Sequence, residues 1–480
     1  MRPLHIPVLC CLFHIRVAGI FGITLAVVGC GSDDEPSARN SPDGGGGQAG
    51  RGGNVGSAAG SGGTGASGSG GTSGSGGSGG TSGTGGVSCA PLPAATGKTV
   101  AVSASKAGEL PSIVSAATTG TTIVLEDGTY TISAPLWFRT PGVTLRSASN
   151  DPTKTIIDGN YAVDETVAIQ TNDITIAHVT LTRAVNHPVH VSPPDGNTNV
   201  TGTVLYGVDF IDGGEQFVKV NPNAARTAYV DEGRVECSLF RLTDQGRPHI
   251  EPNPGGCYTG GIDVHGGQNW VVRNNRFEDI YCDNGSLPEH AIHFWTGSRG
   301  TLVENNQIFD CGRGIGFGLG DTRGERVYAD RPYAGELLGH YDGIIRNNVI
   351  FADNAFYDTG IELHVAKRPI VLHNTIVHGP NATKFFRSID YRYAATDVVI
   401  VNNLTRAIGA RDGAQGTVQN NYDNTPLDYF VSVQNRDFHL KASASEALDK
   451  GVPRSESGVD IDGRPHDQGA PDLGADEYVP

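Results

Sequence analysis

This chain lacks several features that are common in other classes of protein, and each absence argues against one kind of fold, site or partner. Lysine and arginine number 35 against 51 acidic residues, a net charge of −16. Because a protein that binds nucleic acid needs a basic face to neutralise phosphate, this balance argues against nucleic acid as a partner. No Cys-x-x-Cys pair occurs, which argues against a cysteine-based zinc site. Helical periodicity is nearly absent after residue 120, which argues against a helical bundle.

The first residues have the pattern of a targeting segment. Arg2 and Arg16 precede the apolar stretch from Ala18 to Val28, which is too short to span a membrane and ends in Gly29-Cys30. This ending resembles the lipobox of bacterial lipoproteins, in which the cysteine carries lipid. We therefore expect a signal peptide over residues 1–29, lipidation of Cys30, export, and a membrane contact made through the anchor alone. The alternative is an ordinary signal peptide with an incidental cysteine.

Glycine is the abundant residue, with 68 copies, and many of them lie between residues 44 and 86. Such a Gly/Ser-rich segment buries too little apolar area to offset its ordering entropy, so residues 30–88 are predicted to be a disordered linker. Five cysteines then follow, and export would permit disulfides among them. Their odd number predicts at least one free or externally paired thiol. We predict a Cys282–Cys311 disulfide, because these residues follow equivalent turns in adjacent repeats.

The body of the chain is an internal repeat of short β runs. A hydrophobic-x-Asn-Asn-x-hydrophobic pattern occurs at residues 272–277, 303–308 and 345–350, with variants at 372–376, 400–404 and 418–422. Earlier copies end at Leu181, Phe210 and Phe240, so their spacing is nearly constant. A period of roughly 29 residues, with insertions, indicates a solenoid in which each coil stacks on the last. Asparagine tolerates left-handed turns and can form amide ladders between coils.

This repeat resembles the right-handed parallel β-helix proteins, the pectin-lyase-like superfamily. The resemblance implies an all-β solenoid over residues 89–425 with an N-terminal capping helix near residues 109–117. It also implies a C-terminal cap at residues 426–480, over the last coil. Members of this superfamily act on polysaccharides, so an acidic polysaccharide is the expected partner of a chain expected to be monomeric. The signature motifs of polygalacturonases and pectate lyases are missing, so no catalytic residue is carried over from them.

Strand alternation predicts which side chains point outward before each turn. The first outward column is predicted to contain His190, Lys219, Asp263, His293, Gly316, Glu362 and Asp390, and the second Ser192, Asn221, His265, Trp295, Gly318, His364 and Arg392. A merely solvated face would also be polar, but it would favour Thr, Ser and Lys. The many histidines and acids therefore favour a functional face.

Gly316 and Gly318 leave one coil without outward side chains, which predicts a trough for a ligand. The segment from Ile308 to Ile350 includes the longest insertion, and its loop at 319–343 is predicted either to cover this trough or simply to shield the solenoid.

These patterns predict the roles of individual residues. The candidate catalytic residues are His265, His293, His364 and Arg323, since histidine can abstract a proton and arginine can neutralise developing charge. The candidate substrate-binding residues are Asp263, Trp295, Gly316, Gly318, Arg326 and Glu362, with Trp295 stacking on a sugar ring.

Asp263, Glu362 and Asp390 could bind Ca²⁺ through oxygen, although one ion cannot join all three. Asp263 and Glu362 lie three coils apart, roughly 14 Å at strand spacing. That separation is too large for paired hydrolytic carboxylates, so elimination or epimerisation is favoured over hydrolysis. The competing hypothesis is a non-catalytic surface protein that binds a glycan or another partner on the same face.

Overall fold

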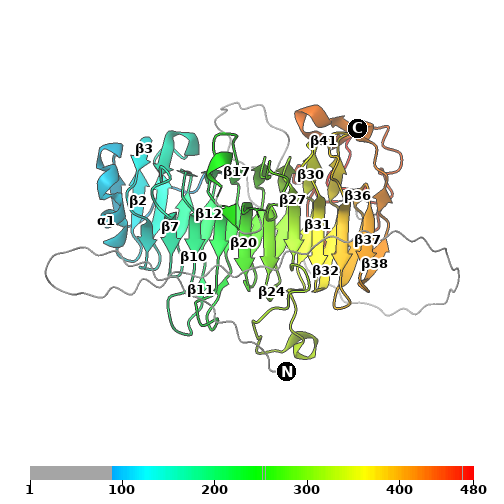
Figure 1. Cartoon of the computed structure of the whole chain (residues 1–480). Coiled ribbons are helices and arrows are strands. Elements are labelled where there is room, and N and C mark those ends of the chain that lie inside the picture. Colours follow the sequence, from blue (N-terminus) through cyan, green and yellow to red (C-terminus); the bar gives the residue numbers. More distant parts are fainter. Residues whose placement is uncertain (1–88, 251, 254–255, 467–468) are drawn as a thin grey trace, which may run out of the picture. The chain divides into compact units, whose positions relative to one another are not determined.

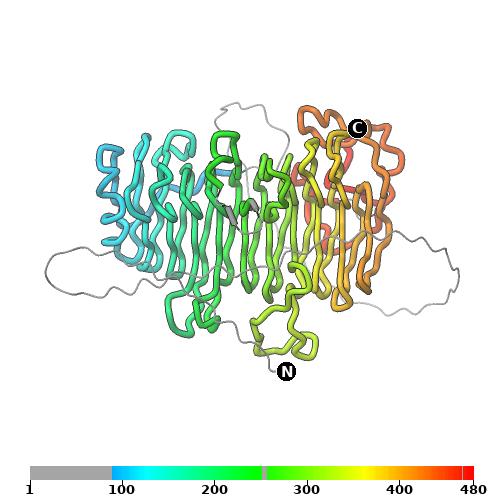
Figure 2. The backbone as a smooth tube through the Cα atoms, viewed as in Figure 1, coloured from blue at the N-terminus to red at the C-terminus, as the bar shows by residue number. Residues whose placement is uncertain are grey.

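The computed structural model describes residues 89–480 except 251, 254–255 and 467–468, and over this range the chain is a parallel β-helix. Three parallel sheets run along the solenoid, and we name them sheet A, sheet B and sheet C. Each complete coil passes through A, then B, then C, and each strand pairs with its counterpart one coil away (Figures 1 and 2). The predicted solenoid is therefore confirmed. The predicted signal peptide, Cys30 and the linker at 30–88 lie outside the described residues.

Sheet A consists of β1 (Thr99–Val102), β2 (Thr122–Leu125), β5 (Thr144–Ser147), β8 (Thr175–Ala177), β12 (Val204–Tyr206), β16 (Arg234–Glu236), β21 (Val271–Arg273), β24 (Ser298–Arg299), β25 (Leu302–Glu304), β28 (His340–Tyr341), β29 (Ile344–Arg346), β32 (Ala366–Leu372), β35 (Asp397–Val401) and β38 (Gln415–Gln419). Sheet B consists of β3 (Gly128–Thr131), β6 (Thr155–Asp158), β9 (Thr180–Thr182), β13 (Asp209–Ile211), β17 (Leu239–Arg241), β22 (Arg276–Glu278), β26 (Gln307–Phe309), β30 (Val349–Ala352), β33 (Thr375–His378), β36 (Leu404–Thr405) and β39 (Tyr422–Asp423). Sheet C consists of β4 (Leu136–Phe138), β7 (Glu165–Ile169), β10 (His187–Val191), β14 (Gln216–Val220), β20 (Gly260–His265), β23 (Ile292–Trp295), β27 (Arg313–Phe317), β31 (Thr359–His364), β34 (Arg387–Arg392) and β37 (Ile408–Arg411). Small pairs outside these sheets are β11 (Val200–Thr201) with β15 (Val230–Asp231), β18 (Pro252–Asn253) with β19 (Gly256–Cys257), and β40 (Phe430–Ser432) with β41 (Asp437–Leu440).

The core runs along the inside of the coils. The predicted inward residues of sheet C, such as Val189, Ile262 and Ile315, are fully buried. On the inner side of sheet B, the rings of Phe210, Phe240 and Phe277 stack coil on coil, with centroids 4.4 and 4.5 Å apart. Repetition of one side chain at the same strand position in successive coils therefore contributes to a continuous close-packed interior.

The two asparagines of the repeat have separate tasks at the corner between sheets A and B. The first, as in Asn305 and Asn347, adopts a positive φ that lets the chain turn. The second forms the predicted ladder, in which the side-chain amide of Asn306 donates to Asn348 Oδ1 at 2.9 Å. The ladder continues through Asn275, Asn374, Asn403 and Asn421. It satisfies polar groups that the stacked coils bury.

The N-terminal end of the core is closed by a helix, as predicted. A 3₁₀ turn, η1 (Ala104–Glu109), leads into α1 (Leu110–Ser115), whose Leu110 and Val114 are buried in the core. Other short 3₁₀ turns are η2 (Pro152–Lys154), η3 (Arg247–His249), η4 (Pro332–Gly335), η5 (Leu427–Tyr429) and η6 (Val433–Asn435). Over the described residues, no helix is both long and apolar enough to cross a membrane.

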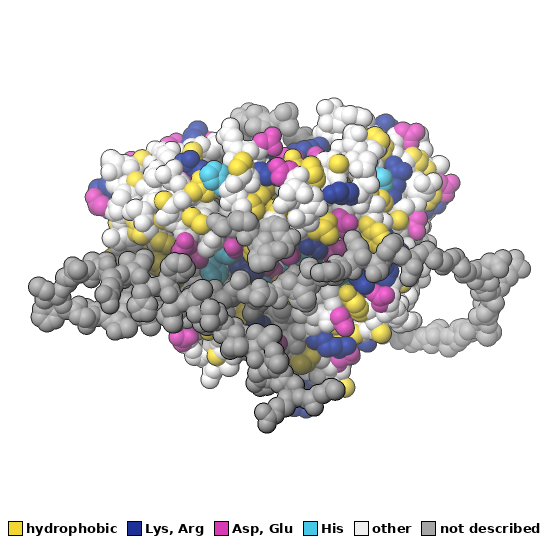
Figure 3. Space-filling model, viewed as in Figure 1, with side chains coloured by type: hydrophobic (Ala, Val, Ile, Leu, Met, Phe, Trp, Pro, Cys, Tyr) yellow, Lys and Arg dark blue, Asp and Glu magenta, His cyan; other side chains and the backbone are white. Residues whose placement is uncertain are grey.

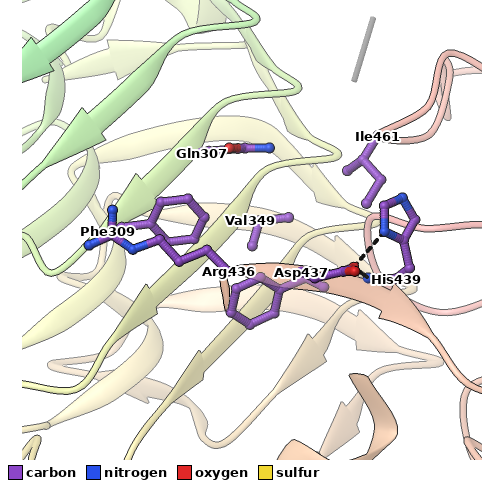
Figure 4. Close-up of a pocket in the computed structure, with 8 residues that line it drawn as sticks. Gln307, Phe309, Val349, Arg436, Asp437, His439 and Ile461 are labelled. Carbon is purple, nitrogen blue, oxygen red and sulfur yellow. Dashed lines mark hydrogen bonds and ion pairs between the residues drawn. The ribbon is translucent and has the colours of Figure 1, made fainter. Parts of the chain in front are cut away.

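The C-terminal segment lies beside the solenoid, which corrects the expected cap over the last coil. Phe430, Phe438 and Leu440 join Phe309 and Phe351 in a separate apolar cluster on the outside of sheet B. β38, in the last coil, stays exposed along its length. Figure 4 shows where β41 meets β26 and β30, around a cavity of about 10 Å³. That volume holds about one water molecule, so this contact is a packing interface rather than a ligand site.

Two disulfides are formed among the described residues, and they correct the predicted pairing. Cys282 bonds to Cys257, and Cys89 bonds to Cys237. Cys257 belongs to the insertion between β17 and β20, which brings it beside Cys282. Cys311 is free, and its side chain is buried in the hydrophobic core. Burial also raises the pKa of the Cys311 thiol well above its usual range.

Candidate functional site

The outward columns of sheet C have the predicted register. His190, Lys219, Asp263, His293, Gly316, Glu362 and Asp390 pair in that order from strand to strand. In the second column, His265 lies opposite Trp295, and His364 lies opposite Arg392. Simple alternation therefore identified which side chains share this face.

From Lys219 to Asp390 the first column is buried, and only His190, at its N-terminal end, is half-buried among these seven residues, so the column is not simply a solvated face. Asp263 is 2% exposed, and His293 and Asp390 are 0% exposed. Buried charges are stable only when they are paired and hydrogen-bonded. Three groups of partners provide that pairing along the column.

We call the first group the lysine cluster: Lys219, Tyr258, Asp263, His265 and Trp295. The Lys219 ammonium bonds to the Asp263 carboxylate, and it lies 3.2 Å from Tyr258 Oη and 3.1 Å from His265 Nε2. The Trp295 indole N–H donates to the second Asp263 oxygen at 2.8 Å. The rings of His265 and Trp295 lie side by side, with centroids 4.5 Å apart.

Electrostatics fix the protonation states of the lysine cluster. Burial alone would lower the pKa of Lys219, but Asp263 outweighs it and holds that pKa above its usual range. Burial, together with the Lys219 charge, lowers the pKa of His265. Burial also raises the pKa of Tyr258. At neutral pH the cluster therefore contains a lysine cation, a neutral histidine and a protonated tyrosine.

We call the second group the histidine cluster: Glu289, His290, His293, Arg313 and Glu362. His290 Nε2 lies 2.7 Å from Glu362 Oε2, and Arg313 Nη1 lies 3.4 Å from the same oxygen. Glu289 Oε2 lies 3.1 Å from His293 Nδ1. Burial alone would raise the pKa of each glutamate, but His290 and the nearby cations hold both pKa values well below the usual range.

The third group surrounds Asp390, near the end of the column. Arg411 binds the Asp390 carboxylate at 2.7 Å, and His364 Nε2 lies 3.5 Å from it. His364 Nδ1 accepts a hydrogen bond from the Gly320 backbone N–H at 3.2 Å. Both ring nitrogens of His364 are therefore engaged.

The three carboxylates that were predicted to bind Ca²⁺ do not fit the role of calcium ligands. Asp263 faces Lys219, Glu362 faces Arg313, and Asp390 faces Arg411. Ca²⁺ requires several oxygen ligands around one point. Asp263 lies three coils from Glu362, and a cation already neutralises each of the three carboxylates, so they do not form a shared calcium site.

The glycines do not form the predicted trough. A Cβ on Gly316 would lie 2.8 Å from the His290 ring. A Cβ on Gly318, where φ is +80°, would lie 1.8 Å from the His364 carbonyl oxygen. The space over this coil is therefore filled by histidine and backbone, and Gly316 and Gly318 serve close packing rather than ligand binding.

Part of the loop at 319–343 packs near the corner between sheets C and A, and its Gly339 packs against Gly318. Arg326 is buried and binds both carboxylate oxygens of Asp231 and the carbonyl oxygen of Gly266. Arg323 is exposed and pairs with Glu336 inside the loop. Neither predicted arginine therefore joins the columns. A cavity of about 290 Å³, lined by residues of this loop such as Tyr328 and Leu337, also lies outside them.

Several site residues were missed because they lie outside the regular alternation. Glu289 and His290 precede β23, Tyr258 precedes β20, and Arg313 begins β27. The run Glu289-His290-Ala291-Ile292-His293, with three ionisable residues in five, was a signal that could have identified them.

Charged side chains also cover the outside of the coils. Figure 3 shows basic and acidic side chains interspersed on the visible part of the described surface. Many form pairs between neighbouring coils, such as Arg273 with Glu236 at 2.9 Å and Arg346 with Glu304 at 2.6 Å. In both of these pairs the glutamate is buried and the arginine is only partly exposed, so the arginine neutralises a carboxylate that the stacked coils shield from water.

The chain is similar to known parallel β-helix proteins. A family model described as "Right handed beta helix region" matches residues 241–405, which agrees with the predicted right-handed parallel β-helix. An alginate lyase from Paenibacillus sp. is 16% identical, with a TM-score of 0.45, over 68% of this chain and 99% of its own. The pectate lyase Pel9A is 16% identical, with a TM-score of 0.43, over 80% of this chain and 97% of its own. The adhesin PfbA of Streptococcus pneumoniae is 10% identical, with a TM-score of 0.36, over 66% of this chain and 99% of its own. No curated protein sequence matches the chain.

Proposed function

We propose that the outer face of sheet C binds an acidic polysaccharide and acts on it by proton transfer, as a lyase or an epimerase. One observation carries the proposal: His265 Nε2 and Tyr258 Oη flank the same Lys219 ammonium at 3.1 and 3.2 Å, in surroundings that lower the pKa of His265 and raise the pKa of Tyr258. Elimination and epimerisation at a uronate each need one proton removed and one proton supplied. A proton gained at His265 and lost from Tyr258 leaves the charge of the lysine cluster unchanged.

The structure favours His265 over the other two candidate histidines for this role. The His265 side chain is 12% exposed, whereas those of His364 and His293 are 7% and 0% exposed. His364 also has both ring nitrogens engaged. Trp295, half-buried beside His265, offers an aromatic surface on which a sugar ring can stack. Trp295 therefore remains the proposed sugar contact, and Asp263 positions its indole.

The test is a screen of uronate polysaccharides, including alginate and polygalacturonate, by binding and by ultraviolet absorbance of unsaturated products. Epimerisation would be read by NMR of the polymer. We expect His265→Gln to reduce kcat about 10²–10⁴-fold while binding is retained. Trp295→Ala should weaken binding instead. His439→Gln, in the C-terminal segment, is the matched control.

Each outcome of this screen is informative. Binding without any product would support the alternative, a non-catalytic glycan-binding protein. Failure to bind any acidic polysaccharide would overturn the proposed function.

We further propose that the protein is exported and anchored through lipid on Cys30. The apolar stretch that ends at Cys30 motivates this, and the two disulfides suit an oxidising compartment. Cys30→Ser should move the protein from the membrane fraction to the soluble fraction. Unchanged membrane association in this variant would contradict the anchor.

A further inference from the structure

Three buried polar atoms converge in the histidine cluster without hydrogen bonds. Among the described residues, Glu289 Oε2, His290 Nδ1 and His293 Nδ1 are all buried and make none. Glu289 Oε2 lies 3.1 Å from His293 Nδ1 and 3.7 Å from His290 Nδ1, and all three atoms lie within 4.8 Å of one another. A buried polar atom left unpaired costs about 1–3 kcal/mol. Three such atoms facing one point indicate that a ligand belongs between them.

The separations suit a metal ion. Tetrahedral bonds of about 2.0–2.2 Å from zinc to nitrogen and oxygen place neighbouring ligand atoms about 3.3–3.6 Å apart. The Glu289–His293 separation of 3.1 Å is slightly shorter than this range, the Glu289–His290 separation of 3.7 Å is slightly wider, and the two histidine nitrogens lie within 4.8 Å of each other. A direct hydrogen bond is a poorer explanation, because Glu289 Oε2 and His293 Nδ1 lack hydrogen-bond geometry despite their proximity.

The opposite ring nitrogens are occupied in the way that metal-binding histidines require. His290 Nε2 lies 2.7 Å from the Glu362 carboxylate, and His293 Nε2 lies 3.3 Å from the Gly318 carbonyl oxygen. If each Nε2 carries the proton and donates it, each Nδ1 presents a lone pair to the shared point. A carboxylate or carbonyl behind the histidine is the usual support of a metal ligand.

We propose that Glu289, His290 and His293 form a binding site for one zinc ion. Two imidazole nitrogens and one carboxylate oxygen favour zinc over Ca²⁺ and Mg²⁺, which prefer oxygen ligands. Three protein ligands leave a fourth coordination position open. Asp263 Oδ1, 3.6 Å from His293 Nδ1, lies on the side of the lysine cluster. This site does not depend on the proposed action on polysaccharides.

A second group with metal-ligand chemistry provides an internal control. His439, Asp462 and Asp476 also place ligand atoms close together. Here the histidine nitrogens are already bonded, to Asp437 at 2.6 Å and to Asp462 at 3.1 Å. This group therefore lacks the unpaired nitrogens that point to a metal at Glu289, His290 and His293.

The test uses the full chain, stripped with a chelator and then titrated with Zn²⁺ by calorimetry, with metal content measured by mass spectrometry. We expect one zinc per chain, no displacement by excess Ca²⁺, and a Co²⁺ derivative with visible absorption bands. Glu289→Gln and His293→Gln should weaken Zn²⁺ binding at least tenfold. Glu362→Gln, behind His290, should weaken it about 10–100-fold. His439→Gln should bind like wild type.

Folding of each variant is checked by circular dichroism, and the wild-type titration decides the matter even if a variant does not fold. Folded wild-type protein that binds no Zn²⁺ would overturn the proposal. So would undiminished binding by folded Glu289→Gln and His293→Gln, or loss of binding only in His439→Gln.

Discussion

The imidazole of His290 covers Gly316 so closely that a methyl group on residue 316 would lie 2.8 Å from Nε2. The ring is held by Glu362 at 2.7 Å, so it cannot move aside without loss of that contact. We expect Gly316→Ala to lower the free energy of unfolding by about 1–3 kcal/mol, measured by urea denaturation. Gly108→Ala is the control, because a Cβ there meets open space. Equal stability of the two variants would contradict this account.

The asparagine ladder should contribute unequally along its length. Asn348 is fully buried and exchanges side-chain hydrogen bonds with Asn306 and Asn374 on either side. Asn348→Ala leaves those buried partners unsatisfied, at about 1–3 kcal/mol for each lost contact. Asn421, at the end of the ladder and only half-buried, has an asparagine partner on one side. Urea denaturation should show a clearly smaller loss for Asn421→Ala, and the reverse order would count against the ladder.

Buried His340 should make the protein sensitive to acid. Burial lowers the pKa of His340 from 6.5 to about 3, so the folded state holds this ring neutral. The unfolded state takes up a proton below about pH 6.5, and stability present above that pH is therefore lost as the pH falls toward 3. The full loss is on the order of 5 kcal/mol. His340→Gln should reduce the fall in Tm between pH 7 and pH 4, and an unchanged fall would rule out this contribution.

His439 should show the opposite pH dependence. Burial alone would lower its pKa, but hydrogen bonds with Asp437 and Asp462 raise it above 6.5. The stability that these bonds contribute is fully present below pH 6.5 and is lost as the pH rises through the folded-state pKa. His439→Gln should therefore lower Tm more at pH 5.5 than at pH 8.5. A larger effect at the higher pH would contradict the assigned ion pairs.

The cysteines of the ordered body should react in a fixed pattern. Cys311 is the free thiol among residues 89–480, and it is buried with a raised pKa. Alkylation of native protein without reductant should spare all five of these cysteines, and alkylation after unfolding should label Cys311 alone. Peptide mapping that finds label on Cys282 under either condition would contradict the Cys257–Cys282 bond.

The regular part of this structure could be predicted because the β-helix repeats one simple rule. Alternation along a strand placed Ile262 and Val264 inside and Asp263 and His265 outside, and the repeat then fixed which coil neighbours each residue. The asparagine corner was predictable for the same reason. The position of a residue in a periodic element depends on its neighbours in the sequence, so it could be predicted from the sequence alone.

The contacts of the candidate site could not be predicted in this way, because many of them involve residues outside the periodic pattern. His290 belongs to a connecting segment, and no periodicity predicts that its ring covers Gly316. Alternation shows which way Asp263 points, but it cannot show that Lys219 and Trp295 enclose it. The Cys257–Cys282 disulfide was missed for a related reason. Cys257 lies in an irregular insertion, and the repeat does not predict where that insertion runs. Contacts made by irregular segments are set by three-dimensional packing, which one sequence does not encode in a readable pattern.

The Cys89–Cys237 bond has a mechanical consequence. It joins the first described residue to a corner 148 positions later, so residues 90–236 form a covalently closed loop. A force applied to the chain before Cys89 passes through the sulfur atoms to Cys237 and bypasses everything between. The N-terminal coils and α1 would carry no load, and tension would enter the solenoid in its interior. Reduction of this one bond would return the load to β1, from which the coils could peel away one at a time.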